Sequence, residues 1–138
     1  MTEYLIDTST ASFVINGNAS VAEALRRAVD HGQVYCSVVT EGELLTGAYR
    51  AGRARRDELA DEISFFFRQL TDVLPVTRII ASAWARLRAV TLAAGQAPPA
   101  NDLWIAATAV ARDMVLVAHD AHFSRIPGLA LEDWLADG

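Results

Sequence analysis

The chain has 138 residues, of which 52% are hydrophobic and 21% charged, and its formal net charge is −5. This composition excludes a disordered chain. The negative net charge gives no sign of a basic nucleic-acid-binding surface. It does not exclude nucleic-acid binding, because acids gathered around metal ions would also make the formal net charge negative. All twelve basic residues are arginine, which argues against a Walker-type phosphate loop, a Schiff-base enzyme and a lysine-dependent phosphorelay receiver.

Length and hydropathy predict one domain, residues 1–138, in the cytoplasm. No segment approaches the roughly 20 apolar residues that a membrane span needs. The first three residues, MTE, lack the basic region of a secretory signal, and no long apolar stretch follows them. Cys36 is the single cysteine and lies in an apolar stretch, so we expect a buried, inert thiol and no internal disulfide.

Short apolar segments alternate with amphipathic stretches along the chain. Strands are predicted at residues 4–6, 34–37, 73–76, 115–118 and 130–132. Helices are predicted at residues 8–15, 21–31 (capped by Ser20), 40–51, 54–70 and 78–94, and in the apolar run that begins at residues 101–102. This alternation predicts an α/β fold in which a short parallel central sheet carries helices on both faces, a Rossmann-like three-layer sandwich.

Four acids lie near the ends of the predicted strands. Asp7 ends the first strand, and Glu43 lies in the first turn of the helix after the second. Asp102 begins the apolar helix before the fourth strand, and Asp120 follows that strand. The carboxyl ends of parallel strands share one edge, where ligands bind. Converging carboxylates repel one another unless a divalent cation joins them, and oxygen ligands favour Mg²⁺ or Mn²⁺.

Each acid also has a purely structural interpretation. Asp7 could cap the helix that follows it. Asn101 and Asp102 could supply a cap together with a favourable charge at the positive end of the helix dipole. Glu43 stands three residues after Thr40, which is the spacing of a capping box. Asp120 could close an Asx turn. Capping explains any one of these acids well, whereas four carboxylates at one edge favour a metal site.

Five segments resemble the motifs of PIN-domain ribonucleases, and especially those of the VapC-type toxins of bacterial toxin–antitoxin pairs. They are YLIDTST, VTEGELLTGA, NDLWIAATA, VAHDAHF and RIPGLALE, and together they span nearly the whole chain. The acids that match the catalytic metal site of the family are Asp7, Glu43, Asp102 and Asp120. The resemblance also implies that Thr8 or Ser9 orients Asp7, and it places Asn101 beside the site.

The segment after the fourth predicted strand departs from the family pattern. The family often has T-x-D-x-D-F where this chain has AHDAHF at residues 118–123. Ala118 replaces the hydroxyl and His122 replaces the second acid, so a second ion could bind weakly or need substrate phosphate. His119 and His122 could be ligands, proton shuttles or solvated side chains.

The resemblance implies metal-dependent hydrolysis of RNA phosphodiester bonds by a toxin that a cognate VapB-like antitoxin neutralises. It further implies a homodimer and an antitoxin that docks an amphipathic segment onto helices of the toxin. Phe65, Phe66 and Phe67 are consecutive in one predicted helix, so at least one of them should be partly exposed and could contact a partner.

Candidate RNA-binding residues follow the Glu43 helix. They are Arg50, Arg53, Arg55 and Arg56, which could contact backbone phosphates. The alternative is a solvated helix face on which Arg53 pairs with Asp57. Two other functions stay open from the sequence: another Mg²⁺-dependent phosphohydrolase or DNA- or RNA-processing nuclease, and an inactive α/β interaction module.

Overall fold

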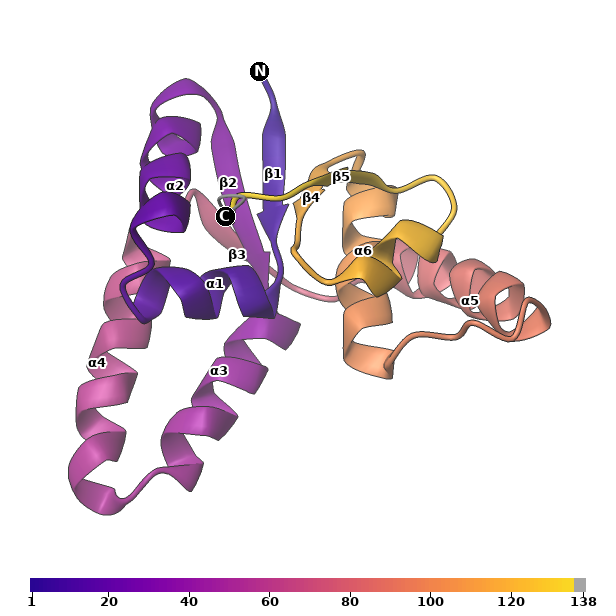
Figure 1. The fold of residues 1–138 in the computed structure, drawn as a ribbon. Coiled ribbons are helices and arrows are strands. Elements are labelled where there is room, and N and C mark those ends of the chain that lie inside the picture. Colours follow the sequence, from indigo (N-terminus) through magenta and orange to yellow (C-terminus); the bar gives the residue numbers. More distant parts are fainter. Residues whose placement is uncertain (136–138) are drawn as a thin grey trace.

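A five-stranded parallel sheet lies between two layers of helices in the computed structural model, which describes residues 1–135 (Figure 1). The strands are β1 (Glu3–Ile6), β2 (Gln33–Ser37), β3 (Asp72–Leu74), β4 (Val115–Val117) and β5 (Ala130–Glu132). The helices are α1 (Thr8–Ile15), α2 (Ala19–His31), α3 (Val38–Arg50), α4 (Arg53–Arg68), α5 (Arg78–Ala93) and α6 (Ala100–Arg112), and a 3₁₀ turn, η1 (Ala121–Arg125), follows β4. The strand order is β3-β2-β1-β4-β5, and all neighbouring strands are parallel.

Alternating side chains on each strand divide the core into two clusters. Leu5 of β1 is paired in register with Leu116 of β4, and both pack among the buried residues of α5 and α6. Ile6 and Val117 form the next pair and pack on the other face, among buried residues of α1, α2 and α4. Figure 1 shows the two groups of helices on opposite sides of the strands. The predicted three-layer α/β fold is therefore confirmed.

Helix α6 is the most deeply buried helix of the fold. Leu103, Ile105 and Ala106 have no exposed surface, and Thr108 is only 1% exposed. Its alanines have small side chains, so the sheet and α5 can pack close to its backbone. The predicted apolar helix before the fourth strand is confirmed, and its burial fixes the position of its amino-terminal turn.

The local start signals of two helices differ from the predictions. Asn18, and not Ser20, caps α2, because the Asn18 side chain accepts a hydrogen bond from the Val21 amide. Helix α3 begins before Thr40 and is capped by Ser37. The strands and helices themselves lie within a few residues of their predicted positions, including the short last strand β5.

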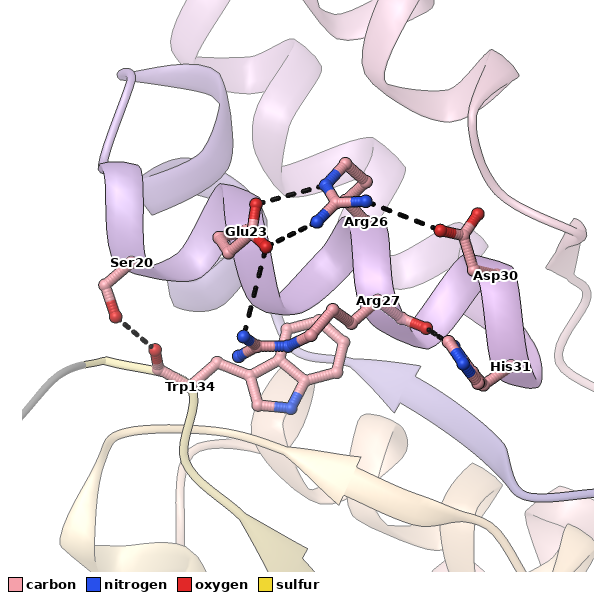
Figure 2. Close-up of polar contacts among 7 residues, drawn as sticks. All are labelled: Ser20, Glu23, Arg26, Arg27, Asp30, His31 and Trp134. Carbon is pink, nitrogen blue, oxygen red and sulfur yellow. Dashed lines mark hydrogen bonds and ion pairs between the residues drawn. The ribbon is translucent and has the colours of Figure 1, made fainter.

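The Ser20 hydroxyl has a different role, which Figure 2 shows. It donates a hydrogen bond of 3.0 Å to the carbonyl of Trp134 and so attaches the segment after β5 to α2. The Trp134 ring is buried and meets Tyr4 edge-on, with 5.6 Å between ring centroids. A groove of about 690 Å³ lies between α2 and this segment, and its exposed rim carries Arg27 and His31.

Cys36 lies in β2 and is completely buried, as predicted. Burial raises the pKa of its thiol far above the ordinary value, so the group stays protonated and unreactive. Within residues 1–135 no helix is both long and apolar enough to cross a lipid bilayer.

We expect Leu103→Ala to lower the free energy of unfolding by about 2–5 kcal/mol, because it leaves a cavity beneath α6. Leu92→Ala on α5 is the matched control, because Leu92 is 53% exposed and its loss should cost less than about 0.5 kcal/mol. Urea unfolding measures both values. Equal losses in the two variants would contradict the packing described for α6.

Candidate metal and nuclease site

The site lies where β1 and β4 end side by side at the centre of the sheet. The Asp7 amide donates to the carbonyl of Val117, the last residue of β4, over 3.0 Å. The Thr10 hydroxyl donates to the same carbonyl over 3.2 Å. The strand order changes direction between these strands, and open α/β sheets bind ligands at this point.

Asp7 is 3% exposed and caps α1, since its Oδ1 accepts a hydrogen bond of 2.8 Å from the Thr10 amide. Burial raises the pKa of this carboxyl above its ordinary value, and the negative charges of Asp102 and Asp120 raise it further. Hydrogen bonds from Thr10 act in the opposite direction. The capping interpretation is correct for Asp7, but this cap lies among other acids, where ionisation is unfavourable.

Glu43 is not part of a capping box. Helix α3 begins before Thr40 and is capped by Ser37, so Glu43 lies beyond the first turn. Its Oε1 accepts a hydrogen bond of 2.6 Å from the Thr8 hydroxyl. Thr8 therefore orients Glu43, whereas the sequence prediction assigned this hydroxyl to Asp7.

Thr40 completes this contact and was missed as a site residue. Its side chain is fully buried, and its hydroxyl oxygen lies 3.1 Å from that of Thr8. The sequence signal was a threonine three residues before an acid, which describes a cap equally well. Only the packing of α1 against α3 distinguishes the two roles.

Asp102 lies in the first turn of α6 without capping it. The N-cap residue is Pro99, which makes no side-chain capping bond. Burial raises the pKa of the Asp102 carboxyl, the charges of Glu43 and Asp120 raise it further, and the hydrogen bond and charge of His122 oppose the rise. The capping part of the structural interpretation is thus wrong for Asn101 and Asp102, whereas the Asp102 charge does lie in the first turn of α6, as that interpretation also allowed.

His122 lies between two of the acids. Its Nε2 is 2.8 Å from Asp102 Oδ2, and its Nδ1 is 2.8 Å from Asp120 Oδ1. Asp120 also accepts a hydrogen bond of 3.1 Å from the His122 amide and so caps η1, which confirms the Asx-turn interpretation. His119 instead contacts Asp133, at 2.8 Å from Nδ1 to Oδ2.

The four acids occupy one neighbourhood, since the charges of Asp102 and Asp120 raise the pKa of Asp7, and the charges of Glu43 and Asp120 raise the pKa of Asp102. As the side chains stand, no three His, Cys, Asp or Glu side chains of residues 1–135 surround a common point suited to a metal ion. The donor set nevertheless fits a divalent cation, because it is carboxylate-rich and its mutual repulsion would fall on binding.

Two neighbours predicted from the sequence are exposed. Ser9 and Asn101 both lie on the surface, and Ser9 lines a pocket of about 530 Å³ beside Asp120. A smaller cavity of about 280 Å³ opens on the other side of the site, where Thr8 and Glu43 form part of its wall.

The predicted RNA-binding arginines lie around the connection between α3 and α4, at the tip of a projecting helical hairpin (Figure 1). Asp57 contacts Arg56 at 3.6 Å, not Arg53 as the structural alternative predicted. Arg55 pairs with Glu58 at 2.8 Å. Arg50 ends α3 two helical turns after Glu43, which is about 10 Å along the helix axis.

Comparison with known proteins decides the family. A family model for the PIN domain matches residues 4–129. The chain belongs to the PIN-domain family. It is similar to ribonuclease VapC5 of Mycobacterium tuberculosis, with 30% identity over 133 residues that cover 91% of this chain and 95% of the relative. The resemblance to VapC-type proteins is therefore confirmed.

Solved structures agree with this assignment of the PIN domain. The DNA-bound VapBC structure from Salmonella typhimurium includes a chain that is 26% identical, with a TM-score of 0.89 over 97% of this chain and 99% of that chain. The toxin–antitoxin structure VapBC-5 from Mycobacterium tuberculosis includes one that is 29% identical, with a TM-score of 0.74 over 99% of this chain and 100% of that chain.

We expect Asp7→Asn to stabilise the fold at neutral pH when a chelator is present. The pKa of Asp7 is raised in the folded state, so the folded protein keeps this proton at pH values above 3.8 at which the unfolded chain has lost it. The stability of the wild type therefore falls as the pH rises from 3.8 through the folded-state pKa of Asp7. Asparagine keeps the cap without the charge. Thermal unfolding should show a gain at pH 7 that disappears near pH 3.8, and a less stable variant at pH 7 would contradict the electrostatic argument.

Proposed function

We propose that this protein is a metal-dependent endoribonuclease and the toxin of a type II toxin–antitoxin system. One observation carries the proposal: Asp7, Glu43, Asp102 and Asp120 gather near the switch point of a PIN-domain sheet, where charges of the neighbouring acids raise the pKa of Asp7 and of Asp102. The relatives that support it are named ribonucleases.

Asp7 and Asp102 are the principal metal ligands in this proposal, and Glu43 and Asp120 complete the coordination, partly through water. The preferred ion is Mg²⁺ or Mn²⁺. When bound, the ion polarises the scissile phosphate and lowers the pKa of a bound water, which makes that water a better nucleophile. Thr8 holds the Glu43 carboxylate in place, and the buried helix α6 keeps Asp102 at a fixed position.

The alternative, an inactive interaction module, requires that all four acids cap helices or turns. That explanation holds for Asp7 and Asp120, which accept capping hydrogen bonds. It fails for Glu43, which lies inside α3, and for Asp102, which makes no capping bond. Two half-buried acids that make no capping hydrogen bond favour a site that binds a cation.

RNA would approach the site along α3. Arg50 and Arg53 lie at the two ends of the α3–α4 connection and are exposed. Neither forms an ion pair with another described residue of the chain, whereas Arg55 and Arg56 are paired. Exposed guanidinium groups suit contacts with backbone phosphates.

The partner of this toxin is a VapB-like antitoxin, and the toxin forms a homodimer in the cytoplasm. Phe65 of α4 is 61% exposed while Phe66 is buried, as expected for consecutive aromatics on one helix. Phe65 borders a groove of about 510 Å³ between α1 and α4, whose walls include Val14 and Ile15. Such a groove suits the apolar face of an amphipathic segment.

We expect Asp7→Asn and Asp102→Asn each to lower metal-dependent cleavage of single-stranded RNA by about a thousandfold or more, because a metal ligand contributes several kcal/mol to transition-state stabilisation. Asp30→Asn is the matched control, because Asp30 lies exposed on α2 and contacts Arg26. Cleavage of a labelled oligonucleotide in Mg²⁺ or Mn²⁺ measures the rates, with structured RNA and DNA as comparison substrates. Wild-type rates in either folded site variant would rule the assignment out.

We expect Arg50→Glu combined with Arg53→Glu to weaken RNA binding and to flatten its salt dependence by about 0.7 in slope for each phosphate that the protein no longer neutralises. Arg26→Glu combined with Arg27→Glu, on α2, is the control with the same charge change. Fluorescence anisotropy across a salt series, using the cleavage-deficient Asp102→Asn background, measures the slope. An unchanged slope would assign these arginines to the solvated surface.

A further inference from the structure

A cavity of about 280 Å³ lies beside Glu43, where α1 lies across the open end of the α3–α4 hairpin (Figure 1). Apolar side chains from all three helices form most of its wall: Ile15, Leu44, Ala48, Leu59 and Ile63. Thr8 and Glu43 also belong to this wall, and the Thr8 hydroxyl holds the Glu43 carboxylate. A group that fills the cavity would therefore lie next to the acid cluster.

Gly47 leaves one wall of the cavity open. It lies in the interior of α3, where glycine lowers helix stability relative to alanine. A Cβ added at Gly47 would meet no atom within 4 Å, and its φ is not in the left-handed region. Neither packing nor backbone conformation requires glycine here, whereas a bare backbone lets a ligand approach closely.

Ser12 and Asn16 bring two neutral polar side chains to the wall. They follow Thr8 at intervals of four residues, so all three lie on one face of α1 and its C-cap. Thr8 and Thr10 use their hydroxyls in hydrogen bonds, whereas no described residue is hydrogen-bonded to the side chain of Ser12 or Asn16. An amide carries a donor and an acceptor in one plane, which matches the edge of a nucleobase.

The size and chemistry of the cavity fit one nucleobase. Its volume is slightly below the roughly 300–1,000 Å³ of pockets for drug-sized ligands, so it suits a single planar ring system. Glu43 is the one charged residue among the described residues of its wall, so the wall offers no cation to a phosphate. Proteins that bind an unstacked base hold it between apolar or aromatic side chains and form hydrogen bonds to its edge.

An apolar side chain of an antitoxin is the competing occupant. It would leave the side chains of Ser12 and Asn16 without partners, which costs free energy where water is excluded. The groove that Phe65 borders is the larger apolar surface for such a segment. The polar groups in the wall of the cavity therefore favour a base.

We infer that this cavity binds the nucleobase next to the scissile phosphate, and that Ser12 and Asn16 select this base through its edge. The inference rests on the proposed function, because Glu43 belongs both to the cavity and to the proposed metal site. A strand of RNA along α3 would meet Glu43, then Gly47 and then Arg50, in their order on the helix.

Cleavage of a randomised pool of single-stranded RNA, with sequencing of the new ends, tests the inference. We expect the wild type to prefer one base beside the cut by about tenfold or more. Gly47→Leu fills the cavity, so it should abolish the preference and lower kcat/KM by about tenfold or more. Asn16→Ala should weaken the preference while the cavity stays open.

Gly42→Leu is the matched control and should keep the wild-type preference. Gly42 also lies in α3 with no atom within 4 Å of an added Cβ, but it does not line the cavity. Leucine favours helix over glycine, so both leucine variants should fold at least as well as the wild type. Thermal unfolding and Mn²⁺ titration check that the fold and the metal site persist in each variant.

A binding measurement tests the cavity without cleavage. An oligonucleotide carries 2-aminopurine or pyrrolocytosine in place of the preferred base, and the Asp102→Asn chain binds it in a chelator. Emission from such analogues rises when the base leaves the stack of its neighbours. We expect this rise with Asp102→Asn alone and with added Gly42→Leu, and its loss with added Gly47→Leu.

The possible results separate this inference from the proposed function. A wild type without base preference beside the cut, or a preference or emission rise that persists with Gly47→Leu, would overturn the role of the cavity. Weakened binding of a VapB-like antitoxin to Gly47→Leu with unchanged base preference would assign the cavity to the antitoxin instead. Absence of Mn²⁺-dependent cleavage of every RNA by the wild type would overturn the proposed function itself.

Discussion

The Val117 carbonyl accepts hydrogen bonds from the Asp7 amide and the Thr10 hydroxyl, and these bonds hold the end of β1 against the end of β4. The strand order reverses between β1 and β4, so the helix after β1 and the loop after β4 both begin at the neighbouring carboxyl ends of these two strands. Asp120 is then close enough to Asp7 for its charge to raise the pKa of Asp7. The remainder of the acid cluster depends on this one junction.

The cluster is electrostatically unfavourable, and the core of the fold stabilises it. Helix α6 is buried on nearly every side, so Asp102 cannot move away from its neighbours without displacing Leu103 and Ile105. Glu43 is held by Thr8, which in turn lies against buried Thr40. The buried core thus holds the carboxylates close together although their charges repel one another. This is expected at a site where a bound cation removes the repulsion.

The segment after β4 contributes both to the core of the PIN-domain fold and to the acid site. Phe123 and Ile126 are buried and fix the course of η1. Both ring nitrogens of His122 lie 2.8 Å from a carboxylate oxygen, while His119 contacts Asp133. Two histidines three residues apart therefore have unequal surroundings, and His122, not His119, contacts Asp102 and Asp120.

Local patterns in the sequence determined the sheet, the burial of α6 and the positions of the four acids near the strand ends, because side-chain periodicity and strand length act within a few residues. The same patterns did not determine which hydroxyl meets which acid. Thr8 contacts Glu43 across 35 residues of chain, and His122 contacts Asp102 across 20. Tertiary packing decided these partners, since they depend on how α1, α3, α6 and η1 lie against one another, which no short-range spacing encodes.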